Sequence, residues 1–201
     1  MSTFNQIAHS LKTSAENIVQ TLKTLDKKQT DGSSVFETDL LNATMEAELV
    51  CRNLRKLLIQ TGIVTRHSLF AQLCSIHNMY VEEKNGEIHV IMPPLPLKKT
   101  AHKNCAFLMD PLAFCLDEYT HNHTCIKYAK ARITICYCYP KGTPARRIRD
   151  CDNIEVKKLL DLLALYFLKD DNMACCEILH TSRPADDYKT EITITDWVDN
   201  R

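Results

Sequence analysis

Apolar residues recur every three or four positions through the first third of the chain, which is the spacing of one helix face. The first such run consists of Ile7, Leu11, Ile18, Leu22 and Leu25. After a polar break, Ser34 opens a capping-box pattern, so a second helix is expected to run to about Leu58 and to stop at Gly62. A third run extends from Thr65 to Met79. Three amphipathic helices suit a small bundle or a surface that contacts another protein.

The spacing changes at Asn85-Gly86, after which strand-like and helix-like patterns are mixed. Residues 87–92 are expected to form a strand, because prolines follow at once and prolines stop strands. Asp110 and Pro111 together are typical of a helix start, with the acid as the cap and the proline in the first turn. The chain from here on therefore differs in kind from the helical region before it.

The clearest strand pattern covers residues 131–139, where β-branched and aromatic residues alternate with others. One face of this strand consists of Ile133, Ile135, Tyr137 and Tyr139. The elements expected after it are a helix from Asn153 to about Phe167 and two strands, at 173–179 and 189–195, that form a hairpin. We therefore predict an α+β fold, with an accessory helical region at residues 1–84 and a mixed sheet with packed helices at residues 85–201.

Composition narrows the classes of protein to which the chain can belong. Hydrophobic residues make up 45% of the 201 residues and charged residues 25%, which is ordinary for a soluble globular protein. The net charge is zero, so any basic binding site has to be local. No apolar run approaches the roughly 20 residues that span a bilayer, and the N-terminus lacks the pattern of a signal peptide. We expect a cytoplasmic protein that does not bind membranes.

Ten cysteines are present, and none lies in a C-x-x-C pair. A zinc ribbon therefore has little support, since such sites use closely spaced cysteine pairs. Without a secretory signal, most of these cysteines are expected to be reduced and buried as small apolar residues.

The strongest candidate for chemistry is a short acidic motif, Asp150-Cys151-Asp152-Asn153. In an extended backbone, residues two apart point the same way, so the carboxylates of Asp150 and Asp152 can reach one ion. Crowded carboxylates repel each other and favour a bound cation, and Mg²⁺ or Mn²⁺ prefers oxygen ligands. The motif therefore predicts a divalent-metal site.

The residues after this motif extend the candidate site. Asn153, Lys157 and Asp161 follow at four-residue steps, and hence on one face of the expected helix. Asp170 and Asp171 come after that helix, where the chain can return to the same end of the sheet. A metal held by the acidic motif and one acid of this pair would activate water and polarise a phosphodiester.

Each half of the site also has a simpler interpretation. Asp and Asn are the usual helix caps, so Asp152 or Asn153 can serve only to start a helix. The sequence Asp170-Asp171-Asn172 is also typical of a turn. The two halves together, beside a basic segment, favour the metal site over either alternative.

That basic segment lies just before the acidic motif. Between Thr124 and Arg149 there is no acidic residue, and the basic residues are Lys127, Lys130, Arg132, Lys141, Arg146, Arg147 and Arg149. Such a segment can neutralise phosphates, and Lys98, Lys99 and Lys103 extend it if the proline-rich loop lies near. The alternative is an ordinary solvated strand and loop.

In these residues the chain resembles the RusA-type Holliday junction resolvases. That family has an arginine-rich loop, a D-x-D-N motif, a helix with a lysine and an aspartate, a D-D pair and a closing strand of the T-I-T type. The matching residues here are Arg146 to Asn153, Lys157 or Lys158, Asp161, Asp170, Asp171 and Glu191 to Thr195. The upstream elements fit as well, so the resemblance covers about residues 86–201.

The resemblance implies a homodimer that cuts branched DNA, four-way junctions above all, with Mg²⁺ or Mn²⁺. By resemblance, the site would consist of the metal ligands Asp150, Asp152 and Asp171, with Asp170 as the other member of its pair, and of Lys157 or Lys158. The lysine would assist phosphate binding or charge stabilisation.

Several features depart from the family pattern, among them a longer loop between Pro140 and Arg149 and a stretch from Asp161 to Asp170 that is about one residue shorter. The lysine and Asp161 lie about one residue later than in the family, and the first eighty residues have no counterpart in a minimal member. The alternative function is therefore a catalytically inactive module of the same type. Such a module would bind DNA, or a protein partner through the N-terminal helices.

Overall fold

The computed structural model of the chain describes residues 3–28, 34–95, 106–124, 127–148, 150, 154–170, 172 and 174–197. Backbone packing divides the chain into two compact units, Met1–Leu69 and Phe70–Arg201. The division lies before the boundary expected after residue 84, because Cys74, Met79 and Val81 pack into the core of the second unit. No helix among the described residues is long and apolar enough to cross a membrane.

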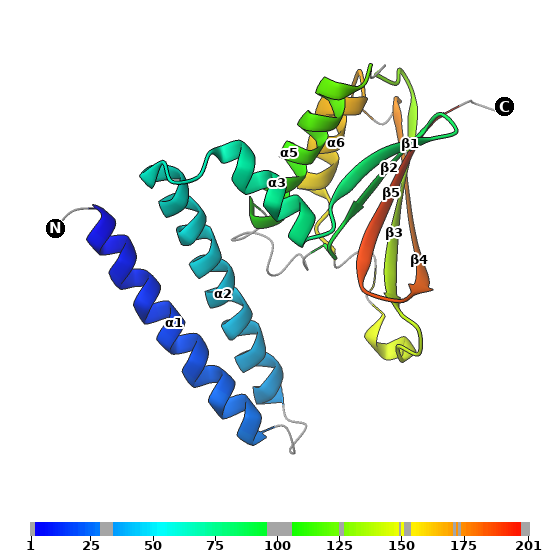
Figure 1. Ribbon diagram of the computed structural model, residues 1–201. Helices are drawn as coiled ribbons and strands as arrows, with labels where there is room; N and C mark the ends of the chain where they lie inside the picture. Colours follow the sequence, from blue (N-terminus) through cyan, green and yellow to red (C-terminus); the bar gives the residue numbers. More distant parts are fainter. Residues whose placement is uncertain are drawn as a thin grey trace. The chain divides into compact units, whose positions relative to one another are not determined.

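The first unit contains two long helices, α1 (Thr3–Lys28) and α2 (Ser34–Thr61), which pack against each other along their length (Figure 1). The end of α2 follows the predicted pattern. Gly62 has a φ of +67°, which glycine adopts without strain, and its N–H donates to the Ile59 carbonyl at 3.2 Å. The predictions for these two helices are confirmed.

The third helix and the first two strands follow directly. α3 (Arg66–Ile76) begins after Thr65, whose hydroxyl oxygen accepts the Ser68 N–H at 3.1 Å. β1 (Tyr80–Lys84) and β2 (Glu87–Met92) then form an antiparallel hairpin. Asn85 and Gly86 make its turn with φ values of 55° and 79°, and two positive φ values are the mark of a type I′ hairpin turn. Placing residues 80–84 in the helical region was therefore wrong.

The strands form one mixed sheet in the order β1-β2-β5-β3-β4 (Figure 1). Its other members are β3 (Ala131–Pro140), β4 (Cys176–Ala185) and β5 (Lys189–Asp196). β3 and β4 are parallel, whereas β5 runs antiparallel to β3 and to β2. The predicted hairpin of the two closing strands is wrong, because β3 lies between β4 and β5. The fold class α+β is confirmed.

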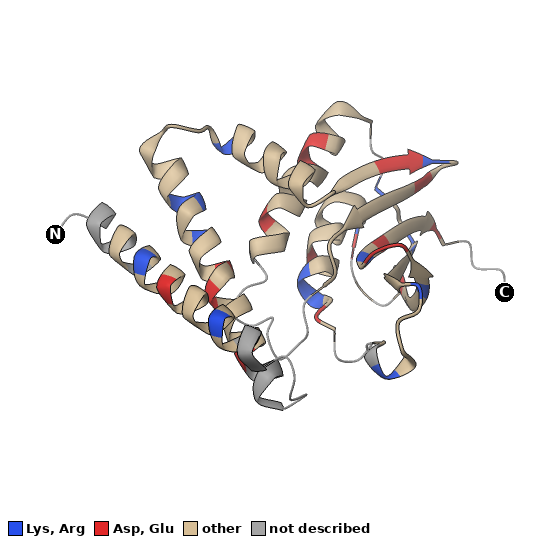
Figure 2. Ribbon diagram, turned by 60° about the horizontal axis from the view of Figure 1, so that its bottom comes forward, with Lys and Arg blue, Asp and Glu red and all other residues tan. Residues whose placement is uncertain are grey.

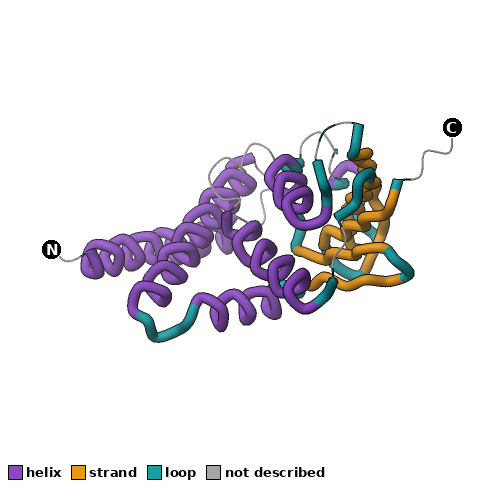
Figure 3. Tube along the Cα trace, turned by 90° about the horizontal axis from the view of Figure 1, so that it is seen from above, coloured by secondary structure: helices purple, strands orange, loops and turns teal. Residues whose placement is uncertain are grey.

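Two helices, α5 (Ala106–Asn122) and α6 (Lys157–Phe167), pack on one face of the sheet, whose strands form a single layer (Figure 3). The fully buried core between them includes Leu112, Leu116, Leu163, Ile135 and Ile194. The predicted start of α5 at Asp110 is wrong, since Pro111 lies inside the helix. The helix begins earlier because Leu108 and Met109 also pack against the core.

Candidate functional site

The acidic motif lies in the connection between two parallel strands. The chain leaves β3, passes through the short 3₁₀ helix η1 (Ala145–Arg147), enters α6 and returns as β4. Parallel strands joined by a helix have their two connections at opposite ends of the sheet. Asp150 lies in the first connection and Asp170 in the second.

Two isoleucines anchor the first connection to the sheet. Ile148 is half-buried, and Ile154 is 2% exposed. Both line a small cavity of about 40 Å³, whose other walls include Tyr137, Tyr139, Tyr188, Leu95 and Thr190. The Thr190 hydroxyl is buried and has no hydrogen-bond partner in the described part of the chain. Asp150 lies between the two anchors with its side chain exposed.

Several predicted site residues lie outside the described part of the chain. These are Lys98, Lys99, Lys103, Arg149, Asp152, Asn153 and Asp171, together with the side chain of Arg147. Their proposed roles therefore stay predictions. The described residues still fix the ends of the acidic motif, because Ile148 and Ile154 flank it on both sides.

The helix after the motif begins later than predicted. Its N-cap is Val156, and the N–H of Lys157 donates to the Glu155 carboxylate at 3.0 Å. The prediction that Asn153 begins the helix is therefore wrong. Ile154 lies in the core ahead of the helix, so the chain needs a non-helical segment to place this side chain and then turn into α6. The predicted end at Phe167 is confirmed.

Lys157 and Asp161 share one face of α6, as predicted. The Lys157 Nζ lies 3.4 Å from an Asp161 carboxylate oxygen, and their side chains are 80% and 54% exposed. Both line a groove of about 440 Å³ beside α6, which also contacts Ile133 and Ile178 of the sheet. Exposed pairs of this kind contribute at most about 1 kcal/mol, so Lys157 can exchange its partner for a phosphate at little cost. Lys158, the next residue on α6, is exposed as well.

Asp170 takes part in a local turn. One of its carboxylate oxygens accepts the Asn172 N–H at 3.2 Å, and the other accepts the Asn172 side-chain amide at 2.7 Å. The Asn172 side-chain oxygen in turn accepts the Ala174 N–H at 2.9 Å. Asp170 is therefore part of a turn, and its role as a metal ligand stays a prediction.

The structure does not bring Asp150 and Asp170 together. The C-terminal end of α6 is tied to the chain just before β3, because Tyr128 exchanges backbone hydrogen bonds of 2.8 and 3.0 Å with Phe167 and Lys169. Asp150 lies at the opposite end of β3. The eleven residues of α6 rise about 16 Å between these ends. The expectation that the chain returns to the same end of the sheet is wrong.

The basic segment is also divided by β3. Arg132, at the start of the strand, forms an ion pair with Glu177 of β4. Lys141, just past its end, lies 2.9 Å from Asp186. Figure 2 shows that the strands of the sheet carry both basic and acidic residues. Among the described side chains of the basic segment, Arg146 of η1 precedes Asp150 most closely in the sequence, and it is exposed.

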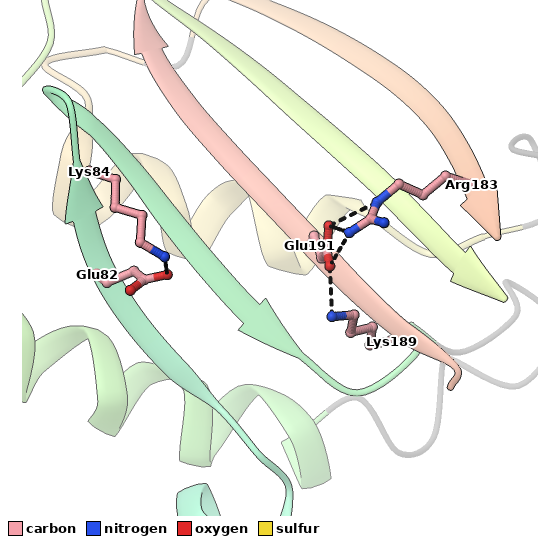
Figure 4. Close-up of polar contacts among 5 residues, drawn as sticks. All are labelled: Glu82, Lys84, Arg183, Lys189 and Glu191. Carbon is pink, nitrogen blue, oxygen red and sulfur yellow. Dashed lines mark hydrogen bonds and ion pairs between the residues drawn. The ribbon is translucent and has the colours of Figure 1, made fainter. Parts of the chain in front are cut away.

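A second cluster was not predicted. The sulfur atoms of Cys136 and Cys138 and a carboxylate oxygen of Glu191 all lie within 4.8 Å of one another. Arg183 reaches across β3 from β4 and contacts both Glu191 oxygens at 2.7 and 2.8 Å, and Lys189 contacts one at 2.8 Å (Figure 4). The sequence signal was available in part, since alternation along β3 puts both cysteines on the face opposite Ile135. The contribution of Glu191 depends on strand order.

The charges around this cluster shift its proton equilibria. Burial by itself raises the pKa of Glu191, but hydrogen bonds from Arg183 and Lys189 outweigh it and hold the pKa below the ordinary value. Burial, with Cys136 and Glu191 nearby, raises the pKa of Cys138 to about 11. Cys138 is therefore a protonated thiol at neutral pH, and none of the described cysteines forms a disulfide.

Comparison with known proteins places nearly all of the chain in one family. No curated protein matches the sequence. A family model does match, over residues 1–199, and its description is a family of unknown function, DUF6100. Because the match spans nearly all of the chain, the protein belongs to the DUF6100 family.

Proposed function

We propose that the chain is a divalent-metal-dependent endonuclease that acts on branched DNA. One observation carries this proposal. Asp150 is exposed between two anchored isoleucines in the connection that follows β3, and the exposed Lys157 comes next along the chain in the first turn of α6. An acid and a lysine in that order suit chemistry on a phosphate, because the acid can hold a cation and the lysine can hold the anion.

The residues of the connection between β3 and α6 would each have a different role in catalysis. Asp150 and Asp152 would hold Mg²⁺ or Mn²⁺, which when bound supplies an activated water and polarises the phosphodiester. Lys157, or Lys158 beside it, would orient the scissile phosphate. Arg146 and its neighbours in η1 would bind the phosphates on either side, which makes binding weaker at high salt.

The position of Asp170 favours a site shared between two copies. Asp170 lies at the far end of α6 from Asp150, so the turn that it forms with Asn172 is too distant to complete the ligand set of its own chain. In a twofold dimer, this turn of one copy can approach the acidic motif of the other. We therefore propose a homodimer in which Asp171 contributes across the interface.

The first test is cleavage of a synthetic four-way junction with Mg²⁺ or Mn²⁺. We expect cleavage by the wild type and a loss of about 100-fold or more in Asp152→Asn, with junction binding retained. Asp117→Asn, which alters an exposed acid on α5, is the matched control and should cut normally. Absence of cutting by pure protein with either metal, on any branched substrate, would overturn the nuclease proposal.

Mixing two inactive variants tests the shared site. If Asp152 and Asp171 act across a dimer interface, a heterodimer of Asp152→Asn and Asp171→Asn contains one intact site and one doubly altered site. The mixture should then nick junctions although each variant alone is inactive. If both acids act within one chain, every site carries a substitution and mixing restores nothing.

A second candidate is a catalytically inactive module that binds a protein partner through the N-terminal helices. Four large apolar residues of α1 and α2 are 44–51% exposed, namely Val19, Leu22, Leu40 and Leu54. Exposed apolar residues gathered on one pair of helices mark an interaction surface. Junction binding without metal, together with no cleavage, would favour this candidate. Failure to bind any nucleic acid at low salt would leave only the protein-binding role.

A further inference from the structure

The cluster of Cys136, Cys138 and Glu191 has the geometry of a preformed metal site. β3 places both cysteines on the same face, and the register of β3 with β5 sets Glu191 directly opposite Cys136. This face is the one that α5 and α6 leave uncovered. All three ligand atoms lie within 4.8 Å of one another, and two adjacent strands hold them. Ligands on strands are positioned more rigidly than ligands on loops.

The ligand chemistry selects the ion. Two thiolates and one carboxylate suit Zn²⁺, whereas Mg²⁺ and Ca²⁺ prefer sites made of oxygen alone. With Zn–S bonds of about 2.3 Å in a tetrahedral site, two sulfurs on one ion lie about 3.8 Å apart. A sulfur and an oxygen on the same ion lie about 3.5 Å apart. The ligand atoms therefore need to close by no more than about 1.3 Å, which side-chain rotation can supply. Three protein ligands leave the fourth position open to water.

Two cations hold the Glu191 carboxylate in place beside the cysteines. Arg183 lies 2.7 Å from one of its oxygens, and Lys189 lies 2.8 Å from the other. Zn²⁺ binds cysteine as the thiolate, so each sulfur that ligates the ion gives up its proton to solvent. Arg183 grips both oxygens of Glu191, and such outer partners orient a ligating carboxylate.

We propose that Cys136, Cys138 and Glu191 bind one Zn²⁺ on the open face of the sheet, with water as the fourth ligand. The ligands of this site are different residues from those of the acidic motif, although Cys138 also lines the cavity beside Ile148 and Ile154. The proposal does not depend on the proposed nuclease activity. The site ties β3 to β5 at the centre of the sheet. The bound ion therefore stabilises the fold of the second unit.

Cobalt substitution tests the site directly. Full-length protein, stripped with a chelator under reducing conditions, is titrated with Co²⁺. We expect a thiolate-to-cobalt charge-transfer band and tetrahedral visible bands at one Co²⁺ per chain, both lost when Zn²⁺ is added and unaffected by excess Mg²⁺. The melting temperature should rise with Zn²⁺ and not with Mg²⁺, since a ligand that binds the native state stabilises it.

Variants assign the ligands. Cys136→Ser and Glu191→Gln should each weaken Zn²⁺ binding at least as much as the loss of an outer-shell partner, about 10- to 100-fold. Cys51→Ser, which alters an exposed cysteine of α2, is the matched control and should bind normally. The absence of a charge-transfer band in the wild type would overturn the proposal. So would a band that survives unchanged in folded Cys136→Ser and Glu191→Gln.

Discussion

His180 of β4 provides a residue-scale prediction on pH. Its Nδ1 lies 2.9 Å from the Tyr137 hydroxyl, and burial holds its pKa below the ordinary value of 6.5. The native state therefore favours neutral His180, and stability is full above the unfolded pKa and falls as the pH drops through the folded pKa. In chemical denaturation, the wild type should lose stability relative to His180→Phe, which cannot titrate, as the pH falls below about 6.5. Parallel pH profiles in the two proteins would contradict this.

Single residues were predictable where the cause is local. Gly62 ends α2 because the left-handed backbone there suits glycine, and Thr65 caps α3 through its own hydroxyl. Predictions from local sequence rules failed where packing in the core determines the conformation of a residue. Asn153 has the residue type of a helix cap, yet α6 begins only at Lys157. The segment before the helix is non-helical because it places the Ile154 side chain in the core. Tertiary burial outweighs a cap that contributes about 1 kcal/mol.

At the scale of elements, α6 has two faces with different roles. One face carries the exposed candidate site residues Lys157 and Asp161, and the other packs into the core. Asp161→Ala removes only an exposed pair and should change the free energy of unfolding by less than about 0.5 kcal/mol. Leu163→Ala removes a fully buried side chain and should cost about 2–5 kcal/mol. Urea unfolding of both variants checks this contrast. If Asp161→Ala destabilises as much as Leu163→Ala, the acid is part of the fold and its effect on cleavage cannot be assigned to the site.

Strand faces were predictable, and strand order was not. Alternation placed Ile133 and Ile135 on the core face of β3, and both are buried. The sequence does not predict that β5 lies on the opposite side of β3 from β4, because the alternation of apolar residues in β5 fits either position in the sheet. This strand order determines the geometry of both candidate sites. It places Glu191 beside the cysteines, and the parallel β3–β4 pair sends Asp150 and Asp170 to opposite ends of the sheet.

At the scale of the whole molecule, the end of α3 belongs with the sheet. Phe70 stacks on Phe114 of α5 with ring centroids 6.0 Å apart, and the Cys74 thiol donates to the Pro111 carbonyl at 3.2 Å. Met79 is 5% exposed in the same core. These contacts join residues on either side of the boundary that the sequence predicted. The helical pattern of residues 65–79 did not predict these contacts, because apolar periodicity identifies a helix but not the part of the protein against which the helix packs.

Two truncations locate the boundary of the second unit. A fragment of residues 65–201 keeps Phe70, Met79 and β1, so it should unfold in one cooperative thermal transition with a native near-ultraviolet circular dichroism signal. A fragment of residues 85–201 loses two large buried side chains, at about 2–5 kcal/mol each, and exposes the edge of β2. The free energy of unfolding of a domain is only about 5–15 kcal/mol, so this fragment should aggregate or melt without cooperativity. Equal melting temperatures for the two fragments would place the boundary at residue 85 instead, and the core contacts of α3 would then contribute little to the stability of the sheet.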